Sequence, residues 1–468
     1  MQSCLSLLPT TRWGRLGLLV GIICPAFLIL TFWYAANSDQ DNIPPILTQI
    51  IPAGHATCQS ATVFQPSSCL EQHYASVNDT DSDLWTYEYF RDGQNEGLSE
   101  SQCNVAFPGL FEDINLATKY WTSNGKISTQ TLDSVHLEHG MTRAMIFEGN
   151  LYVVQTKSKA EDHRRKTIAI LNAMHRALSA APDRRSMPNI DFIFSIEDKA
   201  TDVTGSKTLP LWVLARKASE QSYFLFPDFG FWAWDNMIGK MNNEIGPYDE
   251  VVDKALARER DLTFRDKVPE LVWRGKLSFA PKLRRALLDA ARQKPWNNVK
   301  ELNWQVRDNY LTLDEHCKYQ FIAHVEGRSY SASLKYRQAC HSVIVAHKLQ
   351  YIQHHHYLLN PSGPLQNYVE VERDFSDLDE KMSALLADPD RAQTIADNSV
   401  KTFRERYLTP AAEACYWRAL WRSYGQVSEE ARLFHHTLTG NKIKRGLRFE
   451  TFMLLSSDEM MNYKSNEG

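Results

Sequence analysis

The sequence has no excess of positive charge, and this absence excludes one large class of function. Lysine and arginine together number 52 and the acidic residues 56, so the formal net charge is −4. A nucleic-acid-binding protein needs a strongly basic face, and this balance does not provide one. Disorder is excluded as well, because 43% of the residues are hydrophobic and 23% are charged. At 468 residues the chain is long enough for two packed domains with appendages.

Long hydrophobic runs are also absent, with one exception near the N-terminus. Residues 16–36 read LGLLVGIICPAFLILTFWYAA and carry no charge. A helix of this length crosses a hydrocarbon core of about 30 Å. Arg12 and Arg15 precede the run while Asp39 and Asp41 follow it, so the positive-inside rule keeps the short N-terminus in the cytosol. We therefore expect a single-pass type II membrane protein whose remaining residues lie on the lumenal side.

A cleaved signal peptide is the alternative interpretation of this run. The run is longer than the apolar core of about 7–15 residues that signal peptides have. An A-x-A-like site is not obvious, although cleavage near Ala35-Ala36-Asn37 stays open. The sequence ends in Ser-Asn-Glu-Gly and not in a KDEL-like signal, so we expect the anchor to hold the protein in the Golgi or endoplasmic reticulum.

The eight cysteines contain no C-x-x-C pair, so a zinc cage is poorly supported. Cys4 and Cys24 belong to the expected cytosolic and membrane parts. An oxidising lumen permits disulfides among the remaining residues, which are Cys58, Cys69, Cys103, Cys317, Cys340 and Cys415. The N-glycosylation sequon is Asn78-Asp79-Thr80, in a region expected to be exposed.

The segment that follows the hydrophobic run is polar and has little periodicity, so we interpret it as a stem. Its residues 79–83 read DTDSD and resemble a metal-binding D-x-D motif. No strand precedes them, and a solvated acidic turn is the default interpretation. The expected divisions are a cytosolic tail (1–15), an anchor (16–36), the stem (37–110), an N-terminal half (111–265), a C-terminal half (266–430) and a tail (431–468).

Short apolar runs alternate with helical patterns from about residue 140 onward. The expected strands are Leu151–Thr156, Ile190–Ile196, Pro210–Ala215, Ser222–Phe226, Glu270–Trp273, Gln320–Val325, Ser342–Ala346 and Asn367–Val371. The expected helices are Arg164–Ala181, Tyr248–Arg260, Pro281–Ala291, Ala332–Cys340, Leu378–Ala387, Pro389–Tyr407 and Pro410–Gln426. This alternation predicts an α/β protein with parallel sheets, divided into two Rossmann-like halves at a hinge near Leu262–Pro269. Ligands of such sheets bind at the carboxyl ends of the strands.

The loop after the strand Gln320–Val325 is the strongest candidate for phosphate binding. Ser331 is a plausible N-cap for a helix that starts near Ala332. A strand, a glycine-containing turn and a helix N-terminus together present backbone N–H groups to an anion. Arg328 and Lys335 can add positive charge. The alternative is an ordinary α/β crossover, since every crossover has a strand, a turn and a capped helix.

A second basic turn follows the strand Glu270–Trp273. Arg274-Gly275-Lys276 forms the turn, and Pro281 opens a helix that carries Arg284. Several cations within a dozen residues suit a diphosphate. A solvated basic helix is the alternative.

Two further segments can contribute chemistry on the N-terminal side. Asp198 lies just past the strand Ile190–Ile196, where a carboxylate can act as a general base toward an acceptor hydroxyl or serve as an ordinary cap. The aromatic segment 224–236 reads FLFPDFGFWAWDN, and its rings suit either sugar stacking or a buried core. The run His354–His356 is a poor metal site, because consecutive side chains point in different directions.

Several of these motifs occur together in one known family. In chain order they are DFIFSIED, KASEQSYFLFPDFGFWAW, VWRG followed by basic residues, EHCKYQF, EGRSYS, LKY, CHSVIV, YVEV and AEACYWRALW. The ordered set covers roughly Leu151–Val427 and resembles glycosyltransferase family 90, the capsule-associated and protein O-glucosyltransferase group, in a membrane-anchored form of fungal type. An ordered set is far more specific than any one of its motifs.

The resemblance implies a GT-B fold of two Rossmann-like domains facing a cleft. It also implies inverting transfer from UDP-glucose or UDP-xylose to a hydroxyl of a protein or glycan, with Asp198 as the general base. It matches donor-phosphate contacts to Arg274, Gly275, Gly327, Arg328, Ser329, Tyr330 and Ser331, to which the charge pattern adds Arg284 and Lys335. The implied donor and acceptor pocket is Asp228, Phe229, Phe231, Trp232 and Trp234.

Cysteine pairing and metal use follow from the same resemblance. Cys317 and Cys340 match a family disulfide that brackets the phosphate loop, and Cys415 would pair with a cysteine of the stem. Such a site can stabilise a diphosphate with a helix dipole and cations alone, so the sequence specifies no metal.

One departure from the family pattern concerns the start of the helix after the phosphate loop. Family members commonly carry Ser-x-Arg there, whereas this chain reads Ser331-Ala332-Ser333. Loss of a charge-assisted contact to phosphate costs about 1.5–3 kcal/mol, or ten- to a hundredfold in donor affinity. Arg328 or Lys335 can substitute for the missing cation, or the protein is a weak or inactive paralogue that binds a nucleotide sugar or glycan.

Overall fold

The computed structural model describes residues 85–200, 208–233, 245–303, 306, 308–436 and 440–465. The chain divides into two units, residues 1–81 and 82–468, and all described residues belong to the second. The expected anchor 16–36, the sequon at Asn78, the DTDSD segment 79–83 and the cysteines at 58 and 69 lie outside the described residues. None of the helices within the described ranges is long and apolar enough to cross a membrane.

The first sheet mixes parallel and antiparallel strands, and its order is β15-β2-β1-β3-β4-β6. In chain order the strands are β1 (Met141–Phe147), β2 (Asn150–Lys157), β3 (Ile190–Ser195), β4 (Leu211–Val213), β6 (Phe224–Leu225) and β15 (Leu447–Arg448). β1 pairs antiparallel with both β2 and β3, whereas β3, β4 and β6 are parallel. The expectation of a parallel sheet is therefore correct for β3, β4 and β6 and wrong for β1, β2 and β15.

The turn between β1 and β2 explains this difference. Glu148 and Gly149, with φ values of 48° and 67°, join the two strands. Such a two-residue turn forms a hairpin, and hairpin strands are antiparallel neighbours. Gly149 is also required by space, because a Cβ atom there would lie 2.5 Å from the carbonyl oxygen of Arg184. β1 was not among the strands expected from the sequence, so the hairpin was not predicted.

The second sheet is parallel throughout and doubly wound, as expected. Its order is β12-β10-β9-β7-β8; with the strands numbered 1 to 5 along the chain and the sheet taken from β8, this is 2-1-3-4-5. The strands are β7 (Val268–Gly275), β8 (Asn297–Glu301), β9 (Tyr319–His324), β10 (Val343–His347) and β12 (Val369–Val371). The strand order reverses between β7 and β9, which makes their carboxyl ends the place where such sheets bind ligands.

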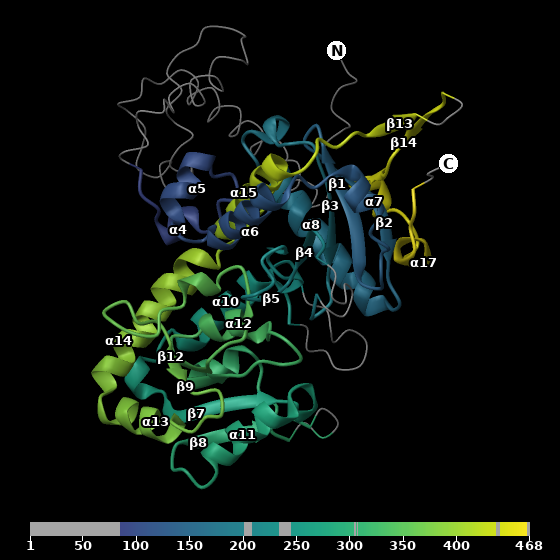
Figure 1. Cartoon of the computed structure of the whole chain (residues 1–468). Coiled ribbons are helices and arrows are strands. Elements are labelled where there is room, and N and C mark those ends of the chain that lie inside the picture. Colours follow the sequence, from purple (N-terminus) through teal and green to yellow (C-terminus); the bar gives the residue numbers. More distant parts are fainter. Residues whose placement is uncertain are drawn as a thin grey trace, which may run out of the picture. The chain divides into compact units, whose positions relative to one another are not determined.

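Helices cover both faces of the second sheet (Figure 1). Successive residues of β7 alternate between two hydrophobic clusters: Leu271 and Trp273 face one, and Val272 faces the other. One face is covered by α11 (Pro281–Ala291), α13 (Leu378–Ala387) and α14 (Pro389–Ser399). The other is covered by α10 (Tyr248–Glu259) and α12 (Ser333–Gln338).

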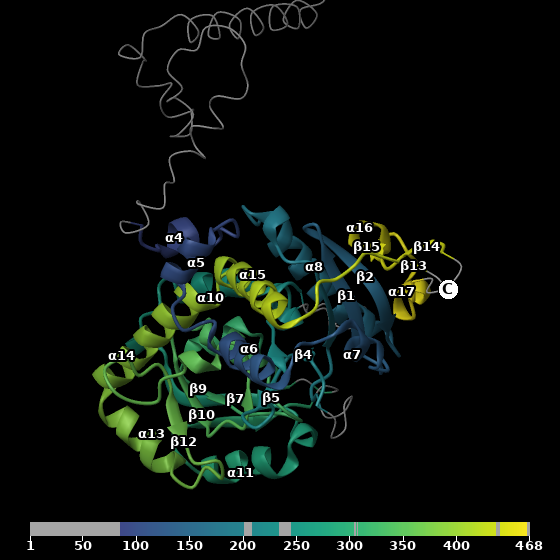
Figure 2. The same cartoon turned by 45° about the horizontal axis from the view of Figure 1, so that its top comes forward.

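The last helix of the expected C-terminal half packs in the hydrophobic core of the N-terminal half. A π-helical turn (Val400–Tyr407) follows α14, where one continuous helix was expected, and leads into α15 (Pro410–Val427). Trp417 and Trp421 of α15 are fully buried in the cluster that contains β3 and β4. α15 contacts α6 (Glu112–Asn124) and α8 (Glu161–Ser179), and Figures 1 and 2 both show it beside α6.

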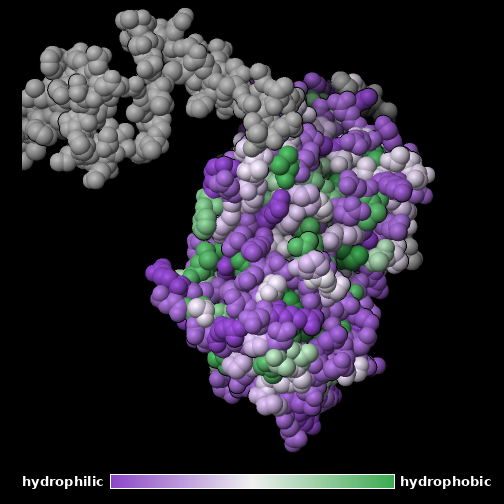
Figure 3. Space-filling view, turned by 90° about the vertical axis from the view of Figure 1, so that its left-hand side faces the viewer, coloured by the Kyte–Doolittle hydropathy of each residue, from purple (hydrophilic) through white to green (hydrophobic). Residues whose placement is uncertain are grey.

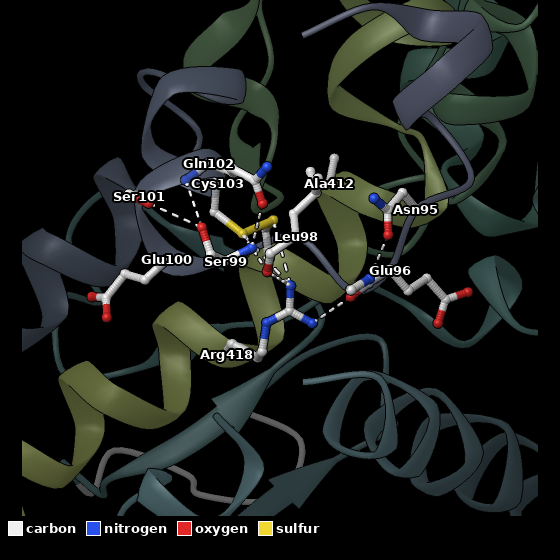
Figure 4. Close-up of a disulfide and its surroundings, with 12 residues drawn as sticks. Asn95, Glu96, Leu98, Ser99, Glu100, Ser101, Gln102, Cys103, Ala412 and Arg418 are labelled. Atoms are coloured by element: carbon white, nitrogen blue, oxygen red, sulfur yellow. Dashed lines mark hydrogen bonds between the residues drawn. A yellow bond between two sulfur atoms is a disulfide. The ribbon is translucent and has the colours of Figure 1, made fainter. Parts of the chain in front are cut away.

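The last part of the expected stem is folded. Residues 85–110 contain α4 (Tyr89–Asp92) and α5 (Glu100–Ala106), and α7 (Thr129–Asp133) follows further along. A disulfide joins Cys103 of α5 to Cys415 of α15, so the expected pairing of Cys415 with a stem cysteine is present. Arg418 donates hydrogen bonds to the carbonyl oxygens of Glu96 and Leu98 beside this disulfide (Figure 4). These contacts attach the N-terminal segment to α15.

The expected C-terminal tail is also folded and covers the outer face of the first sheet. It contains β13 (Phe434–His436), β14 (Lys442–Lys444), β15, α16 (Phe449–Phe452) and α17 (Ser457–Met461). Ala431 and Leu433 are buried against Met145 and Val154 of β1 and β2. A short ladder also joins β5 (Arg216–Lys217) to β11 (Tyr351–Ile352). The face shown in Figure 3 is mainly hydrophilic, with hydrophobic residues in small separate groups.

Candidate functional site

The reversal point between β7 and β9 contains a buried guanidinium group. Arg284 projects from α11, is 7% exposed, and lies 5.7 Å from the ring of Trp273. Its Nε and Nη1 atoms donate to the carbonyl oxygens of Glu326 (3.2 Å) and Lys276 (2.5 Å). A Cβ atom on Gly327 would lie 3.4 Å from Nη2, so the loop after β9 passes close to this group. Burial lowers the pKa of Arg284 to about 10.

Arg337 of α12 is a second buried cation in the same region. It is 8% exposed, and its Nη1 atom lies 2.9 Å from Nδ1 of His324, the last residue of β9. Burial, and then the charge of Arg284, lower the pKa of Arg337 to about 9. Within the described ranges, neither Arg284 nor Arg337 forms an ion pair with a carboxylate. Two buried positive charges without acidic partners favour the binding of an anion between them.

Arg337 was not among the site residues expected from the sequence, although the sequence contains a signal for it. Arg337 follows Ser333 by four positions, and residues four apart lie on the same face of a helix. The cation that the family pattern places at 333 therefore has a neighbour one turn further along α12. The expected helix Ala332–Cys340 includes position 337, but the expected phosphate contacts extend along it only as far as Lys335.

Arg274 uses its guanidinium group to hold neighbouring backbone. It donates to the carbonyl oxygens of Asn309 (2.7 Å) and Asn298 (2.6 Å) and to the side-chain oxygen of Asn298 (2.7 Å). Gly275 follows it, and a Cβ atom there would meet the ring of Trp273 at 2.4 Å. Arg274 thus holds the backbone at the edge of the reversal point. Its N–H donors are occupied by these bonds.

The loop after β9 connects the arginine region to the N-terminal half. The hydroxyl of Ser329 donates to the backbone carbonyl of Asp198, in the loop after β3. Tyr330 is buried, and its pKa is raised well above 10 by burial and then by the charges of Asp228 and Asp198. Arg328 is exposed. The half-buried Asp198 therefore lies beside the same loop that passes Arg284 at Gly327.

The helix after this loop differs from the expected one. α12 has six residues, its N-cap is Ala332, and no side chain caps it. The expected N-cap Ser331 instead forms a hydrogen bond of 2.8 Å with the hydroxyl of Ser333, so this expectation is wrong. A helix this short has a weak dipole. Positive charge at the reversal point therefore comes mainly from arginine side chains.

Lys335 holds the two halves of the described unit together. It is 1% exposed, and its Nζ atom lies 2.7 and 2.8 Å from the carboxylate oxygens of Asp228. Burial lowers the pKa of Lys335, and Asp228 acts in the opposite direction. A Cβ atom on Gly230 would lie 2.3 Å from the Tyr336 hydroxyl, so only glycine permits this close approach. The charge of Lys335, expected to face phosphate, is thus neutralised by a protein carboxylate.

The aromatic segment around Asp228 contributes mostly to packing. Phe229 and Phe231 are buried, and Phe231 packs against Tyr248. Trp232 is half-buried, and the guanidinium of Arg176 lies 4.8 Å from its ring. Trp234 lies outside the described residues. Of the expected pocket, Trp232 is the described aromatic residue that retains partial exposure.

The cysteines and histidines near α12 do not form a metal centre of the described chain. Cys317 and Cys340 form the disulfide that the resemblance implied, so their sulfur atoms beside Glu259 are not free thiolates. The imidazoles of His354 and His355 are buried, and burial lowers both pKa values, that of His354 to about 3. These histidines are therefore neutral packing residues.

The comparison with known families identifies the class of protein. The model described as Glycosyl transferase family 90 matches residues 99–434, well over half of the chain. Protein O-glucosyltransferase 1 of Rattus norvegicus is 21% identical over 254 residues, 52% of this chain and 64% of the rat protein. The human protein of that name is 25% identical over 142 residues, 30% of this chain and 35% of the human protein.

An insect relative matches with similar identity and coverage. The O-glucosyltransferase rumi homolog of Aedes aegypti is 23% identical over 260 residues, 53% of this chain and 63% of that protein. The chain thus matches somewhat less than two thirds of the length of the rat and mosquito relatives. The region matched by the family model includes the second sheet, every strand of the first sheet except β15, and the reversal point between β7 and β9.

Proposed function

Because the chain belongs to glycosyltransferase family 90, we propose that it transfers a sugar from a UDP-sugar to a hydroxyl group. Glucose on a protein acceptor is the first choice, since the relatives are named for O-glucosyl transfer. UDP-xylose and a glycan acceptor are the alternatives. The observation that carries the proposal is a pair of buried arginines at the reversal point of the parallel sheet, Arg284 and Arg337, neither of which has a carboxylate partner among the described residues.

The diphosphate of the donor suits this arginine pair. Burial of a cation without an acidic partner costs desolvation free energy. A bound anion recovers much of that cost, because the cation has already lost most of its water. The guanidinium group also matches phosphate oxygens in geometry. The same charges stabilise the departing UDP, whose negative charge grows as the bond to the sugar breaks. Arg337 supplies the positive charge that Ser333 lacks.

Asp198 is the proposed general base. Its carboxylate accepts the proton of the acceptor hydroxyl as that oxygen forms a bond to the anomeric carbon. The bond between that carbon and the phosphate oxygen breaks at the same time, and UDP leaves with the electron pair. This single displacement inverts the anomeric configuration. The bond from Ser329 to the Asp198 backbone supports the role, because it links the base to the loop that borders Arg284.

The cellular setting is proposed from the sequence. The run 16–36 is proposed to anchor the protein as a type II membrane protein of the Golgi or endoplasmic reticulum. The catalytic part then lies in the lumen, where its disulfides Cys103–Cys415 and Cys317–Cys340 are stable.

The test compares binding with transfer in the full-length protein. UDP binding is measured by calorimetry, and transfer by UDP release from UDP-glucose and UDP-xylose with protein and glycan acceptors. Asp198→Asn should retain UDP binding and lose transfer. Full activity of this variant would remove Asp198 from the mechanism. Wild-type protein that binds UDP but transfers from neither donor would instead be a non-catalytic paralogue.

A further inference from the structure

The loop after β9 extends from the arginine region into the N-terminal half. At its start, Gly327 lies beside the guanidinium group of Arg284. At its other end, the side chain of Tyr330 is 7% exposed and packs in the hydrophobic cluster of the first sheet. Between these two positions, the buried hydroxyl of Ser329 donates to the backbone carbonyl of Asp198. The loop therefore borders the proposed phosphate site at one end and the proposed general base at the other.

The hydroxyl of Tyr330 has no hydrogen-bond partner among the described residues. Tyr424, in the same hydrophobic cluster, instead donates from its hydroxyl to the backbone carbonyl of Asp191 at 3.2 Å. The Tyr248 hydroxyl also lacks a described partner, but it is fully enclosed by protein, whereas the Tyr330 hydroxyl keeps some contact with solvent. A ligand can therefore reach the Tyr330 hydroxyl, and a nearly buried donor of this kind normally has a water or ligand partner.

Two carboxylates lie close enough to Tyr330 to act on its phenol group. Burial raises the pKa of Tyr330 well above 10, and the charges of Asp228 and then Asp198 raise it further. The phenol is therefore a neutral hydroxyl that can donate a hydrogen bond, yet it donates to neither carboxylate. Asp228 is neutralised by Lys335, which leaves Asp198 as the carboxylate of this pair that can act on a substrate.

The chemistry of the proposed reaction determines which part of the donor lies near this hydroxyl. In an inverting displacement, the acceptor oxygen attacks the anomeric carbon from the side opposite the leaving group, and the base lies on that side. With the diphosphate at the arginine pair and the base at Asp198, the transferred sugar lies between them. Tyr330 belongs to the loop that borders both groups, so the sugar is the part of the donor nearest to its hydroxyl.

We propose that the Tyr330 hydroxyl binds a hydroxyl group of the transferred sugar. This inference rests on the proposed function, because it takes Asp198 as the base and the arginine pair as the diphosphate site. The family resemblance matches Tyr330 to phosphate contacts, whereas the structure buries its side chain in the N-terminal half. A sugar hydroxyl both donates and accepts, so it can bond to the phenol and to a carboxylate at the same time. Tyr330 therefore contributes to affinity for the sugar and not to affinity for UDP.

The experiment compares the binding of UDP, UDP-glucose and UDP-xylose to the full-length protein by calorimetry. Tyr330→Phe keeps the buried ring and removes only the hydroxyl. The variant should bind the preferred UDP-sugar about tenfold more weakly through the lost hydrogen bond, and its UDP affinity should change less than about twofold. Its melting temperature should stay within about 2 °C of wild type, because no hydrogen bond within the described protein is lost.

Two matched controls separate contact with a ligand from burial of a hydroxyl. Tyr424→Phe removes a hydroxyl that bonds to the protein, so it should lower the melting temperature and change both affinities less than about twofold. Tyr248→Phe removes an enclosed hydroxyl that has no described partner, and it should also change both affinities less than about twofold.

Three results would overturn the inference. Equal affinity of Tyr330→Phe and wild type for the UDP-sugar would show that the sugar does not contact this hydroxyl. An equal loss of affinity for UDP and for the UDP-sugar would place the contact on the nucleotide. These two results leave the proposed donor site intact. Wild-type protein that binds no UDP would overturn the donor site of the proposed function, and this inference with it.

Discussion

Two buried cations of α12, Lys335 and Arg337, differ in their partners. Lys335 has the Asp228 carboxylate at 2.7 Å. Arg337, two positions further, has a neutral imidazole, and Arg284 has two backbone carbonyl oxygens. Asp228 neutralises the charge of Lys335, so this complete pair is a structural contact between the halves. The charges of Arg284 and Arg337 are not neutralised by any carboxylate of the described residues. This incomplete pair is therefore the better candidate for a ligand-binding site.

Removal of the acid from the complete pair should have the largest effect. Asp228→Ala leaves Lys335 buried and unpaired, and we expect the free energy of unfolding to fall by about 3–5 kcal/mol. Denaturant unfolding measures the change. The double variant Asp228→Ala with Lys335→Met should recover most of the loss, because both charges are then gone. A single variant as stable as wild type would mean that the pair does not hold the halves together.

Glu413 extends the comparison to a buried acid near Asp228. Burial raises its pKa from 4.5 to about 7, against the attraction of Arg176. The folded state therefore binds this proton more tightly than the unfolded state. The resulting stability is fully present below about pH 4.5 and is lost as the pH rises through about 7.

The size of this effect follows from the shift, which corresponds to about 3 kcal/mol. Glu413→Gln keeps the site neutral, so the variant should gain stability relative to wild type at pH 8 and show little gain at pH 4.5. Thermal unfolding across this range measures the difference. A gain that is constant with pH would mean that Glu413 does not titrate in this window.

Replacement of a cation in the incomplete pair should affect binding more than stability. Arg284→Met is expected to weaken UDP binding by about 1.5–3 kcal/mol, or ten- to a hundredfold, through loss of charge-assisted contacts. The free energy of unfolding should change by less than about 1 kcal/mol, since removal of a desolvated charge offsets two lost hydrogen bonds. Calorimetry and unfolding together test this contrast. Unchanged UDP affinity would exclude Arg284 from the donor site.

The smallest effect is expected from Ser333→Arg. If Arg337 already supplies the cation, an added arginine at the half-buried position 333 should change donor affinity by about fivefold or less, the scale of an exposed ion pair. UDP titration measures it. A gain of ten- to a hundredfold would show that the wild-type site lacks a needed charge and favours the weak-paralogue interpretation.

Much of the C-terminal half could be predicted from the sequence. The bounds of α11 and α13 are as expected, and β7, β9 and β10 lie where apolar runs end in polar loops. The local signals are strong: Pro281 occupies the first position of α11, and the strands are apolar runs bounded by turns. The sheet of the N-terminal half was harder to predict. β1 and its hairpin partner β2 set the strand directions there, and β1 was not among the expected strands.

The sequence by itself determined the family, the parallel second sheet and the loops that form the reversal point. Those properties depend on local order along the chain. Only the tertiary structure decided which basic residues are available to a ligand. Lys335 and Arg337 are both basic residues of the same helix. Lys335 contacts the carboxylate of Asp228, whereas Arg337 contacts the imidazole of His324 and no carboxylate in the part of the chain that the structure describes. That difference depends on contacts between segments about a hundred residues apart, which periodicity and spacing do not specify.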